Sequence, residues 1–157
     1  MPSAETGTAV EREVRVAAAA ETVFDFFADP DKMVQWMGRS AQLEPRAGGT
    51  FRVDLNGRDV ARGEYVTVDR PDRVVFTWGW EADDALTAPG SSTVEVTLRP
   101  DGDGTVVRLR HTDLPEEARG AHAHGWEHYM ERLGVAAAGG DPGADPWQTP
   151  EGADAGN

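Results

Sequence analysis

The chain has 157 residues, a length that fits one domain built around a single hydrophobic core. It contains no cysteine, which excludes disulfides, thiolate zinc sites and cysteine nucleophiles, and its net charge of −13 disfavours nucleic acids and anionic membranes as partners. The start of the chain lacks the basic and apolar regions of a signal peptide and no apolar run is long enough for a membrane span, so we expect a cytoplasmic protein.

The two ends of the chain differ in composition from the middle. Residues 1–10 are small and polar without periodicity, which predicts a flexible arm. Residues 140–157 hold three prolines and four acidic residues, and such a segment buries too little apolar surface to offset its ordering entropy. We therefore expect a disordered tail there and one domain over residues 11–139.

Helices are predicted soon after the first strand. Residues 11–16 alternate as a half-buried strand does, and residues 20–28 carry apolar side chains at helical spacing. Asp29-Pro30 ends this helix, because the residue before a proline avoids helical dihedral angles. A second short helix is expected over residues 31–37, closed by Gly38.

The middle of the chain reads as a series of strands. Alternation predicts strands over residues 50–55, 60–68, 74–80, 93–99 and 105–112. In the last hairpin, pairing residue 99 with residue 106 gathers the apolar side chains on one face and sets Glu95 across from Arg110 on the other.

The preceding hairpin allows two registers. Pairing residue 68 with residue 74 turns Glu64 inward, whereas pairing residue 67 with residue 74 turns Tyr65 inward beside Phe76. An unpaired buried Glu64 would cost several kcal/mol or have a raised pKa. We favour Tyr65 inward, with a bulge that lets Val68 pack as well. If Glu64 faced inward, it would be the leading acid–base candidate.

A long helix is predicted over residues 115–138. Pro115 suits its first position, Gly139-Gly140 stops it, and Trp126, Tyr129 and Met130 begin its apolar stripe. Glycines within it suggest close approach to another element. The element order predicts an α+β fold in which a curved antiparallel sheet of six to seven strands surrounds this helix.

Aromatic residues are concentrated where the sheet and the long helix should meet. Their spacing is compatible with an ordinary core or with a cavity that binds an aromatic molecule. If a cavity exists, the predicted ligand-binding residues are Trp36, Phe51, Tyr65, Phe76, Trp78, Trp80, His111, Trp126, Tyr129 and Met130. His111, which faces inward, is either a structural histidine or a group that orients the ligand.

Catalytic and metal-binding signals are weak. The candidates for acid–base chemistry are His111, Tyr65 and Glu64, none of them in a recognised catalytic pattern. His124 and His128 have the i, i+4 spacing of paired metal ligands but lack a third ligand, so we expect them on a solvated face. We predict neither a metal nor a cofactor.

The chain resembles bacterial members of the SRPBCC superfamily, which has the START/Bet v 1-like helix-grip fold, and within it the family of activator-of-Hsp90-ATPase-homologue-1-like (AHSA1-like) proteins. The resembling segments run in family order over residues 11–138 and include Ala20-Glu21-Thr22-Val23-Phe24, Asp29-Pro30-Asp31-Lys32-Met33-Val34-Gln35-Trp36, Gly48-Gly49-Thr50-Phe51-Arg52-Val53, Gly63-Glu64-Tyr65, Pro71-Asp72-Arg73-Val74-Val75-Phe76-Thr77-Trp78, Ser91-Ser92-Thr93-Val94-Glu95-Val96, Leu109-Arg110-His111 and Gly125-Trp126-Glu127-His128-Tyr129. The resemblance implies a helix-grip fold with an apolar cavity between the sheet and the long helix.

Three functions are compatible with this resemblance. The first is binding of a small hydrophobic molecule, aromatic or polyketide-like, without catalysis. The second is a polyketide cyclase-like enzyme or an enediyne-type self-resistance or biosynthesis protein. The third is a protein-interaction module akin to Hsp90 activators. A homodimer is left open, and fold alone does not decide among the three.

Overall fold

The computed structural model describes residues 9–82, 85 and 87–146. The elements in chain order are β1 (Val10–Val16), α2 (Ala20–Ala28), α3 (Pro30–Met33), β2 (Ser40–Leu43), β3 (Thr50–Asp54), β4 (Val60–Asp69), β5 (Arg73–Trp78), β6 (Ser92–Asp101), β7 (Gly104–Thr112) and α4 (Glu116–Ala137).

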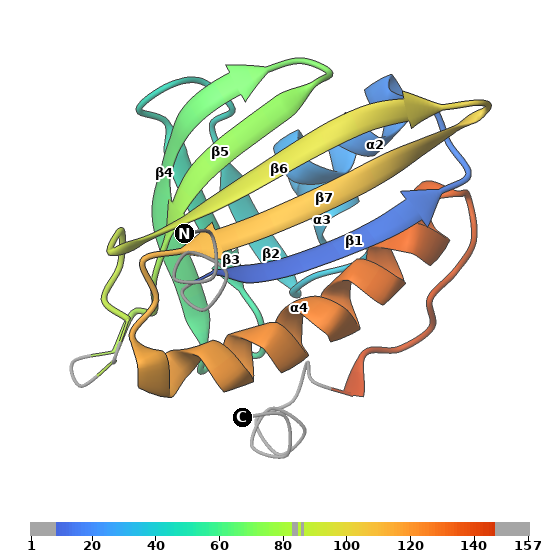
Figure 1. Cartoon of the computed structure of the whole chain (residues 1–157). Helices are drawn as coiled ribbons and strands as arrows, with labels where there is room; N and C mark the ends of the chain where they lie inside the picture. The colour runs from blue at the N-terminus through green and yellow to red at the C-terminus, as the bar shows by residue number, and fades with distance from the viewer. Residues whose placement is uncertain (1–8, 83–84, 86, 147–157) are drawn as a thin grey trace.

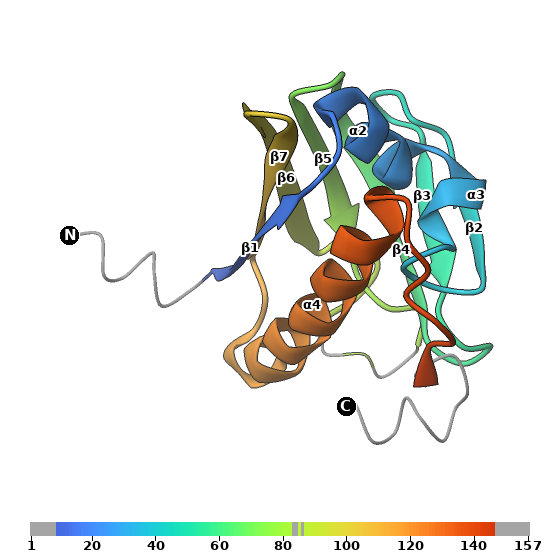
Figure 2. The same cartoon turned by 90° about the vertical axis from the view of Figure 1, so that its right-hand side faces the viewer.

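One antiparallel sheet of seven strands in the order β1-β7-β6-β5-β4-β3-β2 forms the frame of the domain. The sheet curls around α4, as Figures 1 and 2 show from two directions, and α2 and α3 lie near the C-terminal end of that helix. The predicted α+β helix-grip architecture is confirmed. No described helix is both long and apolar enough to cross a membrane.

The hairpin of β6 and β7 has the predicted register. Arg99 pairs with Val106, and Glu95 lies across from Arg110. The inward face is consequently apolar in its middle, and three buried polar residues, Ser92, Thr105 and His111, lie toward its ends.

The hairpin of β4 and β5 combines the two alternative registers through a bulge. Tyr65 pairs with Phe76 and Val68 pairs with Val74, with a register shift between Tyr65 and Thr67. The extra residue, Val66, is 50% exposed, while Tyr65 is buried. Glu64 is exposed rather than turned inward, so it is not the leading acid–base candidate.

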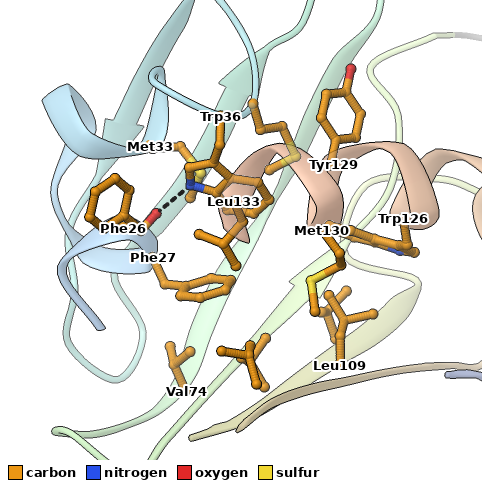
Figure 3. Close-up of a cluster of buried hydrophobic side chains, with 14 of the residues drawn as sticks. Phe26, Phe27, Met33, Trp36, Val74, Leu109, Trp126, Tyr129, Met130 and Leu133 are labelled. Atoms are coloured by element: carbon orange, nitrogen blue, oxygen red, sulfur yellow. Dashed lines mark hydrogen bonds between the residues drawn. The ribbon is translucent and has the colours of Figure 1, made fainter. Parts of the chain in front are cut away.

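Buried side chains satisfy the C-terminal carbonyl groups of α2. A helix leaves its last carbonyls without intrahelical partners, and Pro30 has no amide proton to offer them. The indole nitrogen of Trp36 donates to the carbonyl of Phe26 at 2.9 Å (Figure 3), and the hydroxyl of Tyr65 donates to the carbonyl of Phe27 at 2.8 Å. Both side chains thereby anchor α2 to the rest of the core.

The core lies between the concave face of the sheet and α4. Figure 3 shows Met130 of α4 pointing toward Leu109 of β7, with Leu133 one turn further along the helix near Trp36. Phe51 and Phe76 stack with ring centroids 4.0 Å apart beside this contact layer. These residues are almost completely buried.

Several boundaries differ from the predicted ones. Strand β2 was not predicted, because it is a half-exposed edge strand of four residues, and the alternation of Ala41 and Leu43 is too short to indicate a strand. Strand β5 ends at Trp78, and Gly79 follows because a Cβ there would lie 1.7 Å from the carbonyl oxygen of Ala88. The helical segment after Pro30 is shorter than residues 31–37.

The glycines of α4 do not all mark a close approach. A Cβ at Gly134 would be 3.4 Å from Val14, but nothing lies within 4 Å of one at Gly120 or Gly125. The expectation was therefore wrong at those two positions.

The segment after α4 packs against the helix as far as it is described. Asp145 is buried, and its Oδ1 lies 2.9 Å from Nε2 of His128. Arg132 donates hydrogen bonds to the carbonyls of Pro142 and Gly143. Residues 147–157 of the predicted tail and residues 1–8 of the predicted arm lie outside the described residues.

Candidate functional site

Six polar and aromatic side chains gather where the ends of β5 and β7 meet the start of β6 and the first half of α4. We call them the aromatic–histidine cluster: Trp78, Trp80, Ser92, His111, His122 and Trp126. Period-2 spacing points Trp78 inward from β5, and helical spacing sets His122 and Trp126 on one side of α4. The sheet and α4 thus both contribute side chains to one site.

Trp78 is the centre of the cluster. Its ring centroid lies 5.0 Å from that of Trp126, 5.3 Å from that of Trp80 and 6.0 Å from that of His111. The centroids of His111 and His122 are 5.2 Å apart, with nearly perpendicular planes. Such tilted and edge-on contacts are favourable aromatic geometries.

A directed chain of hydrogen bonds crosses from the helix to the sheet. Nε1 of Trp126 donates to Nδ1 of His111 at 2.9 Å, and Nε2 of His111 lies 2.8 Å from Oγ of Ser92. The Ser92 hydroxyl in turn donates to the carbonyl of Trp78 at 2.8 Å. Since an indole nitrogen only donates, Nδ1 of His111 is an acceptor, and the proton sits on Nε2. His111 is therefore a neutral imidazole with both nitrogens occupied.

His122 is held in the same way but as the other tautomer. Nε1 of Trp80 donates to its Nε2 at 3.1 Å, so its proton is on Nδ1, which donates to the carbonyl of Ala118 at 2.8 Å. Burial lowers the pKa of His122. Burial, with a smaller contribution from neighbouring His122, lowers the pKa of His111 to about 3. Both rings are uncharged at neutral pH.

Two buried polar atoms at this end of the sheet have no hydrogen-bond partner in the described part of the chain: Nε1 of Trp78 and Oγ1 of Thr87. Trp78 is 3% exposed and Thr87 is 1% exposed. Thr87 lies in the segment that returns past β5, since its carbonyl accepts the amide proton of Trp80 at 2.8 Å. Buried donors without partners are rare, because each costs about 1–3 kcal/mol.

With this geometry established, the comparisons with known proteins give the family. The family model for Activator of Hsp90 ATPase homolog 1-like proteins matches residues 17–138. The chain belongs to this family. No curated protein sequence matches it.

Solved structures of similar proteins support the assignment of the AHSA1-like domain. The AHSA1-like protein RHE_CH02687 from Rhizobium etli is 41% identical over 88% of this chain and 87% of its own, with a TM-score of 0.70. CalU16 from Micromonospora echinospora is 25% identical over 83% of this chain and 76% of its own, with a TM-score of 0.68. DynU16, a protein in the dynemicin biosynthetic locus, is 24% identical over 86% of this chain but only 49% of its own, with a TM-score of 0.74, a likeness of fold.

The AHSA1-like domain brings four of the ten predicted ligand-binding residues into the cluster. They are Trp78, Trp80, His111 and Trp126. Phe51 and Phe76 adjoin it, with ring centroids 6.0 and 6.4 Å from that of Trp78.

The other four predicted residues lie in different parts of the core. Trp36 and Tyr65 use their polar atoms to cap α2, and Met130 points toward Leu109. Tyr129 is near the C-terminal segment, and burial, followed by the charge of Asp145, raises its pKa.

The three acid–base candidates have no free group directed into the cluster. Both nitrogens of His111 are bonded, the Tyr65 hydroxyl donates to Phe27 and has a pKa raised by burial, and Glu64 is exposed. Proton transfer by His111 would first require one of its hydrogen bonds to break.

Two members of the cluster escaped the sequence analysis. Ser92 lies just outside the predicted strand of residues 93–99, although it stands two positions before the inward Val94 and so shares its face. His122 lies one helical turn before Trp126, a spacing that signals a shared face. Thr87 lies in a loop, and no periodicity indicates its burial.

Metal ligands do not assemble within residues 9–82, 85 and 87–146, where no group of three or more suitable side chains occurs. His124 is exposed as expected, but His128 is half-buried against Asp145 and Tyr129. A shallow groove of about 430 Å³ between β1 and the first turns of α4 is lined by side chains of both charges, among them Glu11, Arg12 and Arg119.

Proposed function

We propose that this protein binds a small hydrophobic aromatic molecule at the aromatic–histidine cluster. The observation that carries the proposal is the buried indole nitrogen of Trp78, which lacks a hydrogen-bond partner among the described residues although the Trp78 ring contacts three other rings of the cluster. A ligand that inserts there would gain stacking of about 0.5–1.5 kcal/mol per ring pair and would satisfy this donor.

Binding fits the cluster better than acid–base catalysis does. The histidines are neutral and fully bonded, so they can shape a binding site but do not offer a free proton donor or acceptor. The fold likeness to DynU16, a protein of a biosynthetic locus, is consistent with a small-molecule partner. The hydrogen bonds from Trp80 to His122 and from Trp126 to His111 join α4 to the sheet at this site, so both elements would contribute to ligand binding.

Ligand titration with two matched helix variants tests the proposal. Fluorene, a flat uncharged aromatic, should quench tryptophan fluorescence saturably in the wild type. Trp126→Ala should weaken that binding by at least about tenfold, since it removes a ring in tilted contact with Trp78. Leu133→Ala is the control, because Leu133 is equally buried on α4 but next to Trp36 rather than in the cluster.

The outcome separates a binding site from a solid core. Retained binding in Leu133→Ala and lost binding in a folded Trp126→Ala support the proposal. Equal loss in both variants, or no saturable quenching in the wild type, overturns it. Because a Trp→Ala change in a core costs about 3–5 kcal/mol, Trp126→Phe serves where Trp126→Ala does not fold.

A further inference from the structure

The chemistry of the cluster defines what kind of molecule it can hold. Its hydrogen bonds form two closed sets: Trp126, His111, Ser92 and the Trp78 carbonyl form one, and Trp80, His122 and the Ala118 carbonyl form the other. Each donor in these sets already has an acceptor. The indole N–H of Trp78 is left over, and this group can only donate.

The electrostatics of the cluster select against charge. Neither histidine can take a second proton without facing the N–H of a tryptophan, so the members of the cluster carry no positive charge. An anionic ligand buried among these rings would lack a counter-ion and would meet a protein of net charge −13. A cationic ligand would lose its hydration without a carboxylate among the cluster members to replace it.

We infer that the ligand is an uncharged aromatic compound with a carbonyl-type acceptor, an aryl ketone or a quinone, whose oxygen accepts the hydrogen bond of Trp78 Nε1. This inference rests on the proposed function and narrows it to one chemical class. The hydroxyl of Thr87, in the segment whose backbone bonds to Trp80, is a second buried polar group without a partner among the described residues.

Three probes built on the same ring system test whether the site prefers a carbonyl group, an uncharged hydrocarbon or a negative charge. 9-Fluorenone carries a carbonyl, fluorene lacks it, and fluorene-9-carboxylate replaces it with a negative charge. The wild type should bind fluorenone roughly tenfold more tightly than fluorene, because only the ketone satisfies the buried donor. The carboxylate should bind more weakly than both, as measured by calorimetry at one salt concentration.

Trp78→Phe tests which residue supplies the donor. The variant keeps an aromatic ring but lacks the N–H, so the affinity ratio of fluorenone to fluorene should fall to about one. Trp36→Phe is the matched control, because it removes an indole N–H that donates to Phe26 outside the cluster, and it should keep the ratio.

A second readout avoids any dependence on how well the variants fold. The chain has five tryptophans, and each indole N–H gives its own signal in a ¹H–¹⁵N spectrum of the wild type. Fluorenone should move the proton signal of Trp78 downfield, as a new hydrogen bond does, whereas fluorene should not.

The possible results are distinguishable. Equal binding of fluorenone and fluorene, or an unmoved Trp78 signal with bound fluorenone, overturns this inference and leaves the proposed function standing. Preference for the carboxylate overturns the assignment of an uncharged ligand. Failure of all three probes to bind overturns the inference together with the proposed function.

Discussion

His111, which is buried, and His122, which is partly buried, lie with their ring centroids 5.2 Å apart, and each accepts a hydrogen bond from a tryptophan. Protonation of either ring would turn its acceptor nitrogen into a donor and set two N–H groups against each other. The stability of the contact between α4 and the sheet therefore depends on pH through these two histidines.

Stability should fall as the pH is lowered from neutrality. In the unfolded chain these histidines bind protons near pH 6.5, whereas in the folded protein the pKa of His111 is about 3 and that of His122 is also lowered. Below about pH 6.5 the unfolded state thus binds more protons, and the free energy of unfolding should drop by roughly 1 kcal/mol per pH unit for His111, with a further loss in the same direction from His122. Urea denaturation between pH 7 and pH 5 measures this slope.

The comparison variant for this prediction is His111→Gln, which removes the histidine whose pKa is lowered to about 3 and should make the slope shallower. Proton NMR titration gives an independent check. A His111 ring signal that titrates near pH 6.5 in the folded protein would contradict the prediction.

Tyr65→Phe should destabilise the protein without changing ligand binding. The variant removes the hydroxyl that donates to the Phe27 carbonyl at 2.8 Å and leaves a buried acceptor unpaired, at a cost of about 1–2 kcal/mol. Chemical denaturation measures the loss, and fluorene titration measures binding. Weakened binding with unchanged stability would mean that Tyr65 belongs to the site rather than to the cap of α2.

Two glycine substitutions should have opposite effects. Gly125→Ala should raise the free energy of unfolding by about 0.5–1 kcal/mol, since a Cβ there meets nothing within 4 Å and alanine is the better helix former. Gly79→Ala should lower it markedly, because its Cβ would lie 1.7 Å from the carbonyl oxygen of Ala88. Thermal denaturation of both variants is the measurement, and equal shifts in the same direction would refute the structural explanation.

Asp145→Ala should destabilise the protein by roughly 1–3 kcal/mol. The substitution removes a buried carboxylate that contacts Nε2 of His128 at 2.9 Å and Nε of Arg132 at 3.8 Å. Glu131→Ala, at an exposed position of the same helix, is the matched control. If both variants unfold at the same urea concentration as the wild type, the C-terminal segment does not contribute to stability.

The sequence predicted the architecture because apolar periodicity is strong in most of these elements. Val94, Val96 and Leu98 fixed the inward face of β6, and the charge pair of Glu95 and Arg110 fixed its register with β7. Edge strand β2 carries only a short signal, since its four residues contain two alternating apolar side chains, Ala41 and Leu43.

The site was predictable only in part. The spacing of Trp78, Trp80 and Trp126 indicated an aromatic cluster, but it did not show where their polar atoms would go. Whether an aromatic residue joins the ligand site or caps a helix depends on tertiary contacts. Trp36 is an example, since its indole donates to a carbonyl ten residues earlier in the chain. Asp145 was likewise assigned to a polar tail, because composition does not reveal a partner such as His128.

The bulge in the hairpin of β4 and β5 bears on how this domain can vary in length. Tyr65 pairs with Phe76, Thr67 with Val75 and Val68 with Val74. Val66 therefore has no paired residue on β5. Deleting it would restore regular pairing and leave Tyr65 and Val68 two positions apart on the same inward face. The expected loss is the additional local twist that a bulge contributes to a curved sheet. A one-residue gap at this point is thus neutral for the core, whereas elsewhere in the same strand it would reverse every side chain beyond it.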